Sequence, residues 1–261
     1  MREIFDIPDV SHPDPTRRAQ IQMKRPLPKR FYSDVSVSQE EGGFAILLDG
    51  RPVRTPAKNP LVAPTAALAE LIRVEWAAQG EEVDPATMPV TKLVNTAIDG
   101  VAADPQAVFE DILRFSASDL LCYRAESPEE LVARQADKWD PIIDWAASDL
   151  GARFILVEGI MPQEQPREAT AAFAVTLKKY DTPIELACLH TVTTLTGSAI
   201  LALAVAEARL APDDAWALAH LDEDWTNEHW GTDAEAQARR SQRQGEFRAA
   251  TSAFLSLRAP S

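Results

Sequence analysis

The spacing of apolar residues changes once along the chain, and this change constrains the fold more than any other feature. From Phe31 to Leu48, apolar side chains alternate with polar ones, and Glu40-Glu41-Gly42-Gly43 separates two alternating runs. Alternation with a period of two indicates strands, and a glycine-containing break between them indicates a hairpin. From Pro64 onward the apolar spacing is mostly helical. The pattern predicts a small antiparallel sheet followed by helices.

Further short strands and one covering helix complete the predicted N-terminal region. Asp49-Gly50 marks a second turn, and Pro56 and Pro60 bound the short apolar runs that follow it. The helix that opens at Pro64-Thr65 carries its apolar residues at helical spacing: Leu68, Leu71, Ile72 and Trp76. Trp76 is therefore predicted to be a structural residue packed over the apolar face of the sheet.

Most of the remaining chain is predicted to be helical. Ser127 and Thr182 each precede a proline and lie three residues before a glutamate, which is the pattern of a capping box with proline at the first helical position. Leu120–Tyr123 is interpreted as a short extended link. Trp139 and Trp145 sit among apolar residues at helical spacing and are predicted to be structural core residues. The predicted helices cover 88–101, 105–116, 127–150, 166–180, a segment starting at 182, 198–210, 213–228 and 232–257.

These elements define an α+β chain. It has an N-terminal small antiparallel sheet with a covering helix and a C-terminal, mostly helical domain. Residues 1–29 are rich in proline and charge, and we expect them to form a flexible arm. The expected domain limits are 30–104 for the N-terminal α+β domain and 105–261 for the helical domain.

Charge and composition exclude several classes of partner. The formal net charge of -14 repels phosphate backbones and anionic lipid, so nucleic acid is not an expected partner. The most apolar stretch, 183–210, contains polar and charged residues that would be costly in lipid, so we expect no membrane insertion. Cys122 and Cys188 do not suggest a disulfide framework. The N-terminal sequence shows no signal or transit pattern, so a cytoplasmic protein in a reducing compartment is expected.

The sequence contains none of the common catalytic or nucleotide-binding motifs. There is no phosphate-binding loop, dinucleotide fingerprint, nucleophile elbow or zinc-protease pair of histidines. Cys122 lies in an apolar string and is predicted to be a buried, inert thiol. His190 is predicted to be a hydrogen-bonded core residue. The prediction is a protein with no catalytic residues, no metal and no cofactor, which does not use ATP.

One acidic cluster near the C-terminus leaves two interpretations open. Glu228, His229, Asp233 and Glu235 could surround a metal in a hydrolase, or they could be solvated carboxylates at a helix start or an interface. Trp225 and Trp230 flank the polar string 226–229, which is interpreted as loop-like. Aromatic rings in polar surroundings are typical of binding hot spots. The residues predicted to bind a partner are Trp225, Glu228, Trp230, Asp233 and Glu235.

Three blocks of residues resemble a known family. The first block consists of Arg30-Phe31-Tyr32, Glu41-Gly42-Gly43-Phe44, Leu48-Asp49-Gly50-Arg51, Thr55-Pro56 and Glu75-Trp76. The second block consists of Asp119–Arg124, Pro128-Glu129-Glu130-Leu131 and Trp139–Trp145. The third block consists of Trp225, Asn227, Trp230, Asp233 and Glu235. Together they resemble the ATP synthase assembly factors that chaperone the alpha subunit. Thr226 stands where this family is expected to have glycine.

The resemblance implies a two-domain chaperone that binds the unassembled alpha subunit of F-type ATP synthase and promotes assembly of the catalytic hexamer. It implies no ATP use. A bacterial member would be cytoplasmic, and a eukaryotic one would lie in the mitochondrial matrix. The alternatives are a protein-binding adaptor for another complex and a metal-dependent hydrolase built on the acidic cluster. Oligomeric state, contact face and affinity are not predicted.

Overall fold

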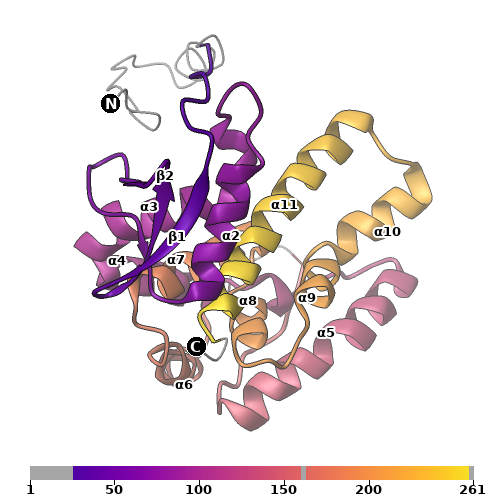
Figure 1. The fold of residues 1–261 in the computed structure, drawn as a ribbon. Coiled ribbons are helices and arrows are strands. Elements are labelled where there is room, and N and C mark those ends of the chain that lie inside the picture. The colour runs from indigo at the N-terminus through magenta and orange to yellow at the C-terminus, as the bar shows by residue number, and fades with distance from the viewer. Residues whose placement is uncertain (1–25, 160–162, 259–261) are drawn as a thin grey trace, which may run out of the picture. The chain divides into compact units, whose positions relative to one another are not determined.

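A computed structural model describes residues 26–159 and 163–258. The chain divides into two compact units, one holding the residues up to Gly100 with those from Ser256, and the other spanning Val101–Leu255. The α+β fold class is confirmed (Figure 1). The arm and domain limits expected from the sequence stay predictions, and most of the expected arm lies outside the described residues.

A small antiparallel sheet forms the centre of the first unit. Strand β2 lies between β1 on one side and β3 and β4 on the other, and the β1–β2 register runs from Val35 opposite Leu48 to Glu40 opposite Gly43. The predicted hairpin is thus confirmed. The strands are β1 (Val35–Glu40), β2 (Gly43–Leu48), β3 (Arg51–Pro52) and β4 (Val62–Ala63).

Helix α2 (Ala66–Ala77) packs on this sheet (Figure 1). Thr65 caps its N-terminus by accepting a hydrogen bond from the backbone N–H of Leu68, and the apolar face buries Leu68, Ile72 and Trp76. The 3-10 helix η1 (Pro85–Thr87) and helix α3 (Pro89–Asp99) follow. The helices predicted in this region are confirmed, because proline at the first helical position and side-chain caps are local signals.

The second unit is built around α8 (Ala199–Ala206), in which every residue is buried. Its N-terminus is held by Ser198, whose side chain accepts from Leu201 N–H. Helices α4, α5, α7 and α9 contact it. The other helices of the unit are η2 (Val101–Ala103), α4 (Pro105–Ser116), η3 (Leu120–Cys122), α5 (Glu129–Asp149), α6 (Arg167–Leu177), α7 (Pro183–Thr196), α9 (Pro212–Ala219), α10 (Leu221–Trp230) and α11 (Ala234–Ser256).

The capping box predicted at Thr182 is confirmed, and the one predicted at Ser127 is wrong. Thr182 and Glu185 exchange side-chain and backbone hydrogen bonds at the start of α7. At α5 the N-cap position is Pro128, which has no side chain able to accept a hydrogen bond, and the helix starts at Glu129. The helix is where the sequence places it, but the serine lies one residue too early to cap it.

Two further local predictions need correction. Leu120–Cys122 is not an extended link but a 3-10 turn, which leads into β5 (Tyr123–Arg124). Strand β5 pairs in parallel with β6 (Val157–Glu158), a strand that the sequence analysis did not predict. Two-residue strands carry too little periodicity to be recognised, and their pairing is long-range.

The polar string 226–229 is helical and not loop-like. The predicted helix 213–228 is two helices, α9 and α10, which meet at His220. The His220 imidazole lies over the Trp216 ring, and its Nδ1 is 2.8 Å from the Trp216 carbonyl oxygen. Burial lowers the pKa of His220. Helix α10 continues through the polar string to Trp230 because its exposed positions can be polar without cost.

Candidate functional site

The predicted partner-binding residues lie on a helical hairpin in the second unit. Helix α10 ends at Trp230, Gly231 turns the chain with a φ of +86°, and α11 begins at Ala234 (Figure 1). Asp233 caps α11 by accepting a hydrogen bond from Ala236 N–H at 2.8 Å. The Arg240 guanidinium pairs with the Asp224 carboxylate, so α10 and α11 are fastened to each other.

The two tryptophans of this hairpin have different surroundings. The Trp225 ring stacks on the His229 ring with centroids 4.0 Å apart, and His229 Nδ1 lies 2.7 Å from the Trp225 carbonyl oxygen. Trp230 is 81% exposed, the largest exposed fraction among the bulky apolar side chains of the described residues. An exposed tryptophan at a turn is available for a partner, whereas Trp225 is partly covered by its own helix.

Two carboxylates of the hairpin form ion pairs with arginines. Glu228 makes a two-point ion pair with Arg134 of α5, with N–O distances of 2.6 and 2.9 Å. The hydrogen bonds from Arg134 hold the pKa of Glu228 below its usual value. Glu235 pairs with Arg239 one turn along α11, yet its side chain stays 80% exposed. Glu235 and Trp230 therefore remain accessible from solvent.

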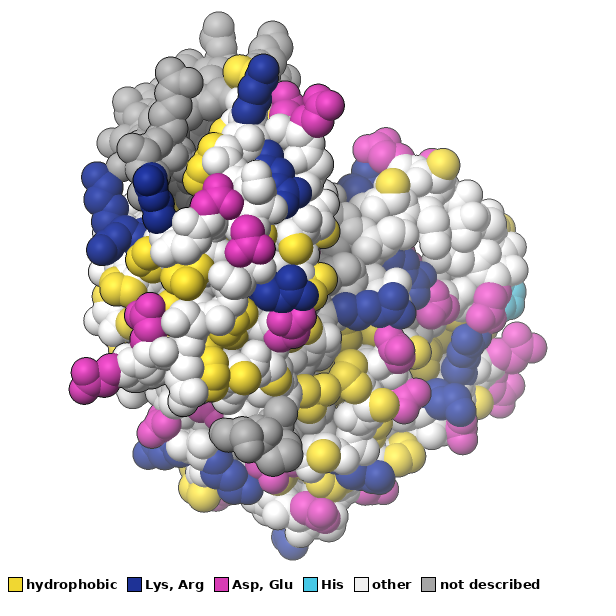
Figure 2. Space-filling model, in the orientation of Figure 1, with side chains coloured by type: hydrophobic (Ala, Val, Ile, Leu, Met, Phe, Trp, Pro, Cys, Tyr) yellow, Lys and Arg dark blue, Asp and Glu magenta, His cyan; other side chains and the backbone are white. Residues whose placement is uncertain are grey.

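The hydrolase alternative finds no support in this arrangement. In the described parts of the chain, no group of three or more His, Cys, Asp or Glu side chains could hold a metal ion. The four candidate residues are engaged separately: Glu228 with Arg134, His229 with Trp225, Asp233 with the α11 N-terminus and Glu235 with Arg239. On the face shown in Figure 2, acidic and basic side chains are interspersed.

The isolated candidates for chemistry are structural in their contacts. Cys122 is buried, and burial raises the pKa of its thiol, which disfavours the reactive thiolate. His190 is hydrogen-bonded as predicted, with Nε2 2.8 Å from Asp111 Oδ2, but it is half-buried and not part of the core. Trp76, Trp139 and Trp145 are all buried, and Trp139 donates from Nε1 to the Leu218 carbonyl at 3.0 Å.

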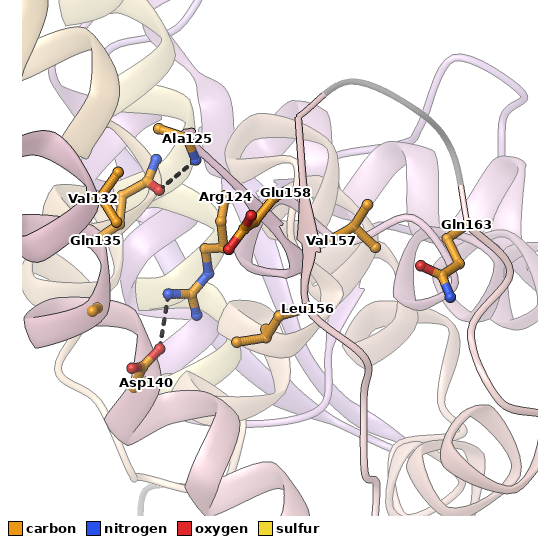
Figure 3. Close-up of a pocket in the computed structure, with 10 residues that line it drawn as sticks. Arg124, Ala125, Val132, Gln135, Asp140, Leu156, Val157, Glu158 and Gln163 are labelled. Atoms are coloured by element: carbon orange, nitrogen blue, oxygen red, sulfur yellow. Dashed lines mark hydrogen bonds and ion pairs between the residues drawn. The ribbon is translucent and has the colours of Figure 1, made fainter. Parts of the chain in front are cut away.

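Sequence reasoning missed a cleft in the second unit, between α5 and β6. Its volume is about 680 Å³, and Arg124 lies across its floor (Figure 3). Arg124 Nη1 is 2.8 Å from Asp140 Oδ1, an ion pair whose angles are outside hydrogen-bond geometry. The resemblance blocks contain both residues. The opposite wall, formed by Leu156 just before β6 and by Glu158 in β6, was not predicted from the sequence.

Comparison with known proteins gives concordant results. Residues 29–147 match the family model described as ATP12 chaperone protein. The chain is 70% identical to a candidate chaperone from Agrobacterium tumefaciens, with a TM-score of 0.87 over 95% of this chain and 92% of that one. Its sequence is 41% identical to that of Atp12 from Paracoccus denitrificans. The crystal structure of that protein superposes with a TM-score of 0.82 over 88% of this chain and 98% of that one.

The chain belongs to the ATP12 chaperone family. The mitochondrial protein atp12 of Schizosaccharomyces pombe is 24% identical over 227 residues, which are 82% of this chain and 78% of that protein. The family resemblance noted in the sequence is thus confirmed, and this ATP12-family protein is an ATP synthase assembly chaperone. Among residues 26–159 and 163–258, no helix combines the length and the apolar character that a membrane crossing requires.

Proposed function

We propose that this ATP12-family chaperone binds the unassembled alpha subunit of F-type ATP synthase through the tip of the α10–α11 hairpin and works without ATP. The observation that carries the proposal is that Trp230, at the end of α10, and the Glu235 carboxylate, in the first turn of α11, are both exposed. A free subunit exposes surfaces meant for its neighbours in the hexamer, and covering them prevents wrong associations. Such covering is binding work and needs no catalytic site.

The chemistry of the tip fits a partner surface with apolar and basic groups. Trp230 offers a large ring, and Asp233 and Glu235 offer oxygens to Arg or Lys of the alpha subunit. Aromatic residues beside such charged pairs are typical of interface hot spots. The contribution of these carboxylates to the α11 dipole is small, about 0.3 to 1 kcal/mol each. Their replacement is expected to affect binding more than folding.

Independence from ATP is supported by the absence of a phosphate-binding loop in the sequence. We further propose a location in the bacterial cytoplasm, because the solved structures similar over most of the chain come from two bacteria. For a eukaryotic source the corresponding location would be the mitochondrial matrix. Calorimetry with ATP is expected to show no binding at micromolar concentrations, and a measurable binding heat would contradict this part.

The decisive experiment compares two glutamates in matched positions. Glu235 and Glu168 are both exposed and both lie in the first turn of a helix, α11 and α6. Glu235→Lys is expected to abolish capture of purified alpha subunit, while Glu168→Lys captures it as the wild type does. Circular dichroism and thermal melting are expected to stay near wild type for both variants.

Trp230→Ala, with Val175→Ala as a control at an exposed apolar position of α6, tests the ring in the same assay. Wild-type protein that captures no alpha subunit would leave the adaptor alternative as the better description. Equal capture by Glu235→Lys and Glu168→Lys would place the binding face elsewhere.

A further inference from the structure

The cleft between α5 and β6 has two walls. The residues of each wall lie on one side of their segment, as their spacing along the sequence requires. Val132, Ala136 and Asp140 lie four residues apart on α5, which places them in one line along the helix. Leu156, which directly precedes β6, and Glu158, which ends it, lie two residues apart, a spacing that places both side chains on the same side of an extended backbone. Figure 3 shows Leu156 and Glu158 directed toward Arg124 and α5, with Val157 directed away. The result is an elongated groove between a helix and a strand.

The accessible charge of this groove is negative, although it contains an arginine. The Arg124 side chain is only 9% exposed, donates from Nε to the Leu121 carbonyl at 2.9 Å, and pairs with Asp140. Its guanidinium also lies 5.4 Å from the centre of the Trp139 ring. Glu158 is exposed, and no described residue forms an ion pair with it; Asp140 is 46% exposed. The groove therefore favours a cationic group over an anionic one.

The same groove exposes apolar surface. The Leu156 residue is 43% exposed, and Val132 and Ala136 are half-buried on the opposite wall. A concave site with aliphatic walls and a few polar groups is the usual composition of a ligand-binding site. An aliphatic side chain between the two walls would bury all three residues.

We propose that this groove is a second client-binding site, which takes a segment of the alpha subunit in which an aliphatic side chain neighbours a Lys or Arg. The inference rests on the proposed function and names the kind of segment bound. The aliphatic group packs between Val132, Ala136 and Leu156, and the cation pairs with Glu158.

The groove extends to the start of α10, the end of that helix opposite Trp230, so one client bound at both sites would lie along the length of α10. Gln135 accepts a hydrogen bond from Ala125 N–H at 2.8 Å and donates one to Asp222, the second residue of α10. A second cavity of about 360 Å³ borders Arg124, Gln135 and Asp222. Two linked contacts on one client raise its overall affinity above that of either contact alone.

Two matched pairs of variants test the groove. Ala136→Phe fills it, whereas Ala133→Phe adds the same ring to an exposed position of α5 that does not line it. Leu156→Ser removes one apolar wall, whereas its neighbour Ile155→Ser changes a side chain of similar exposure outside the lining. The probes are purified alpha subunit and an array of overlapping synthetic peptides that cover the alpha-subunit sequence.

Wild-type protein is expected to bind array peptides that contain an aliphatic residue next to Lys or Arg. Ala136→Phe and Leu156→Ser are expected to weaken that binding about tenfold or more, with Ala133→Phe and Ile155→Ser unchanged. Glu158→Lys is expected to remove the preference for basic peptides. Each variant is first checked for a wild-type melting temperature, and a variant that unfolds is replaced by Ala136→Leu or Leu156→Ala at the same wall.

If each groove variant binds peptides as well as its control variant, while whole alpha subunit is still captured, the proposal that the groove binds the client is wrong. The proposed function would stand in that case. Failure of wild-type protein to bind alpha subunit in any form would overturn both. Self-association of the wild type that Ala136→Phe abolishes, measured by sedimentation, would assign the groove to a second copy of this chain and overturn the client proposal.

Discussion

The N-terminal unit and the α10–α11 hairpin use the same residue types for opposite purposes. In the N-terminal unit, Glu75 of α2 accepts hydrogen bonds from Val90 N–H, Thr91 N–H and the Thr91 hydroxyl, all at 2.7 to 2.8 Å. It thereby caps α3, whose own N-cap residue, Met88, has no side-chain cap. In the hairpin, Glu235 reaches only Arg239 and stays exposed.

The tryptophans of the two regions differ in the same way. The Tyr32 hydroxyl donates to the Trp76 carbonyl at 2.7 Å, and the two rings meet edge to face. Trp76 is 1% exposed, against 81% for Trp230. A residue that belongs to a recognisable motif can therefore hold the fold or face the solvent. Burial and the number of internal partners separate the two roles.

The largest effect is expected from Trp76→Arg. The substitution removes a buried ring and places a charge where the sheet and α2 leave no room for water. The free energy of unfolding should fall by an amount on the order of 3 to 5 kcal/mol. Thermal melting and solubility measure it. An unchanged melting temperature would mean that the ring is exposed, and would end the contrast with Trp230.

Asp119 extends the comparison to a fully buried carboxylate of the second unit. It accepts from Ile200 N–H at 2.9 Å and Leu121 N–H at 3.1 Å, and burial raises its pKa to about 6 despite these bonds. Because the pKa is higher in the folded state, the stability linked to Asp119 is present at low pH and is lost as pH rises from about 4 through 6. The loss is roughly 3 kcal/mol at full ionisation.

Carbon NMR of the Asp119 carboxyl group is expected to show titration near pH 6. Asp49 of the first unit supplies the control, because hydrogen bonds from the backbone N–H groups of Asp34 and Ser33 hold its pKa below the usual value. An Asp119 resonance that titrates together with Asp49 would refute the buried-charge interpretation.

Glu75→Ala is expected to cost about 1 to 3 kcal/mol, because three donors at the start of α3 lose their acceptor. The midpoint of urea unfolding measures the change. Burial also raises the pKa of Glu75, so the stability linked to this group is present at low pH and falls as the pH rises through the folded-state pKa. The cost of the substitution should therefore be larger at acidic pH than at neutral pH. A cost that does not change with pH would contradict the raised pKa of Glu75.

The smallest effect is expected from Glu235→Ala. Its ion pair with Arg239 is an exposed pair one turn apart, and such pairs contribute about 0.3 to 0.5 kcal/mol. The urea midpoint should therefore stay within error of the wild type, while capture of the alpha subunit falls. A loss of stability comparable to that of Glu75→Ala would make Glu235 a structural residue.

The sequence by itself determined the elements whose signals are local. Alternation predicted the β1–β2 hairpin, helical spacing predicted α2, and Thr182 with Glu185 predicted the start of α7. These signals act between residues a few positions apart, so they keep their meaning whatever the rest of the chain does. The three sequence blocks also predicted the family, because their combination is more specific than any one block alone.

Tertiary structure alone decided the features that depend on distant partners. The pairing of Tyr123 with Val157 joins segments 34 residues apart in sequence and gave no periodic signal. The 226–229 string is polar yet helical, because α10 is fastened to α5 by Glu228 and Arg134 and to α11 by Asp224 and Arg240. The groove beside Arg124 forms only where β6 meets α5. Burial, register and concavity are set by packing between segments, and no single segment encodes them.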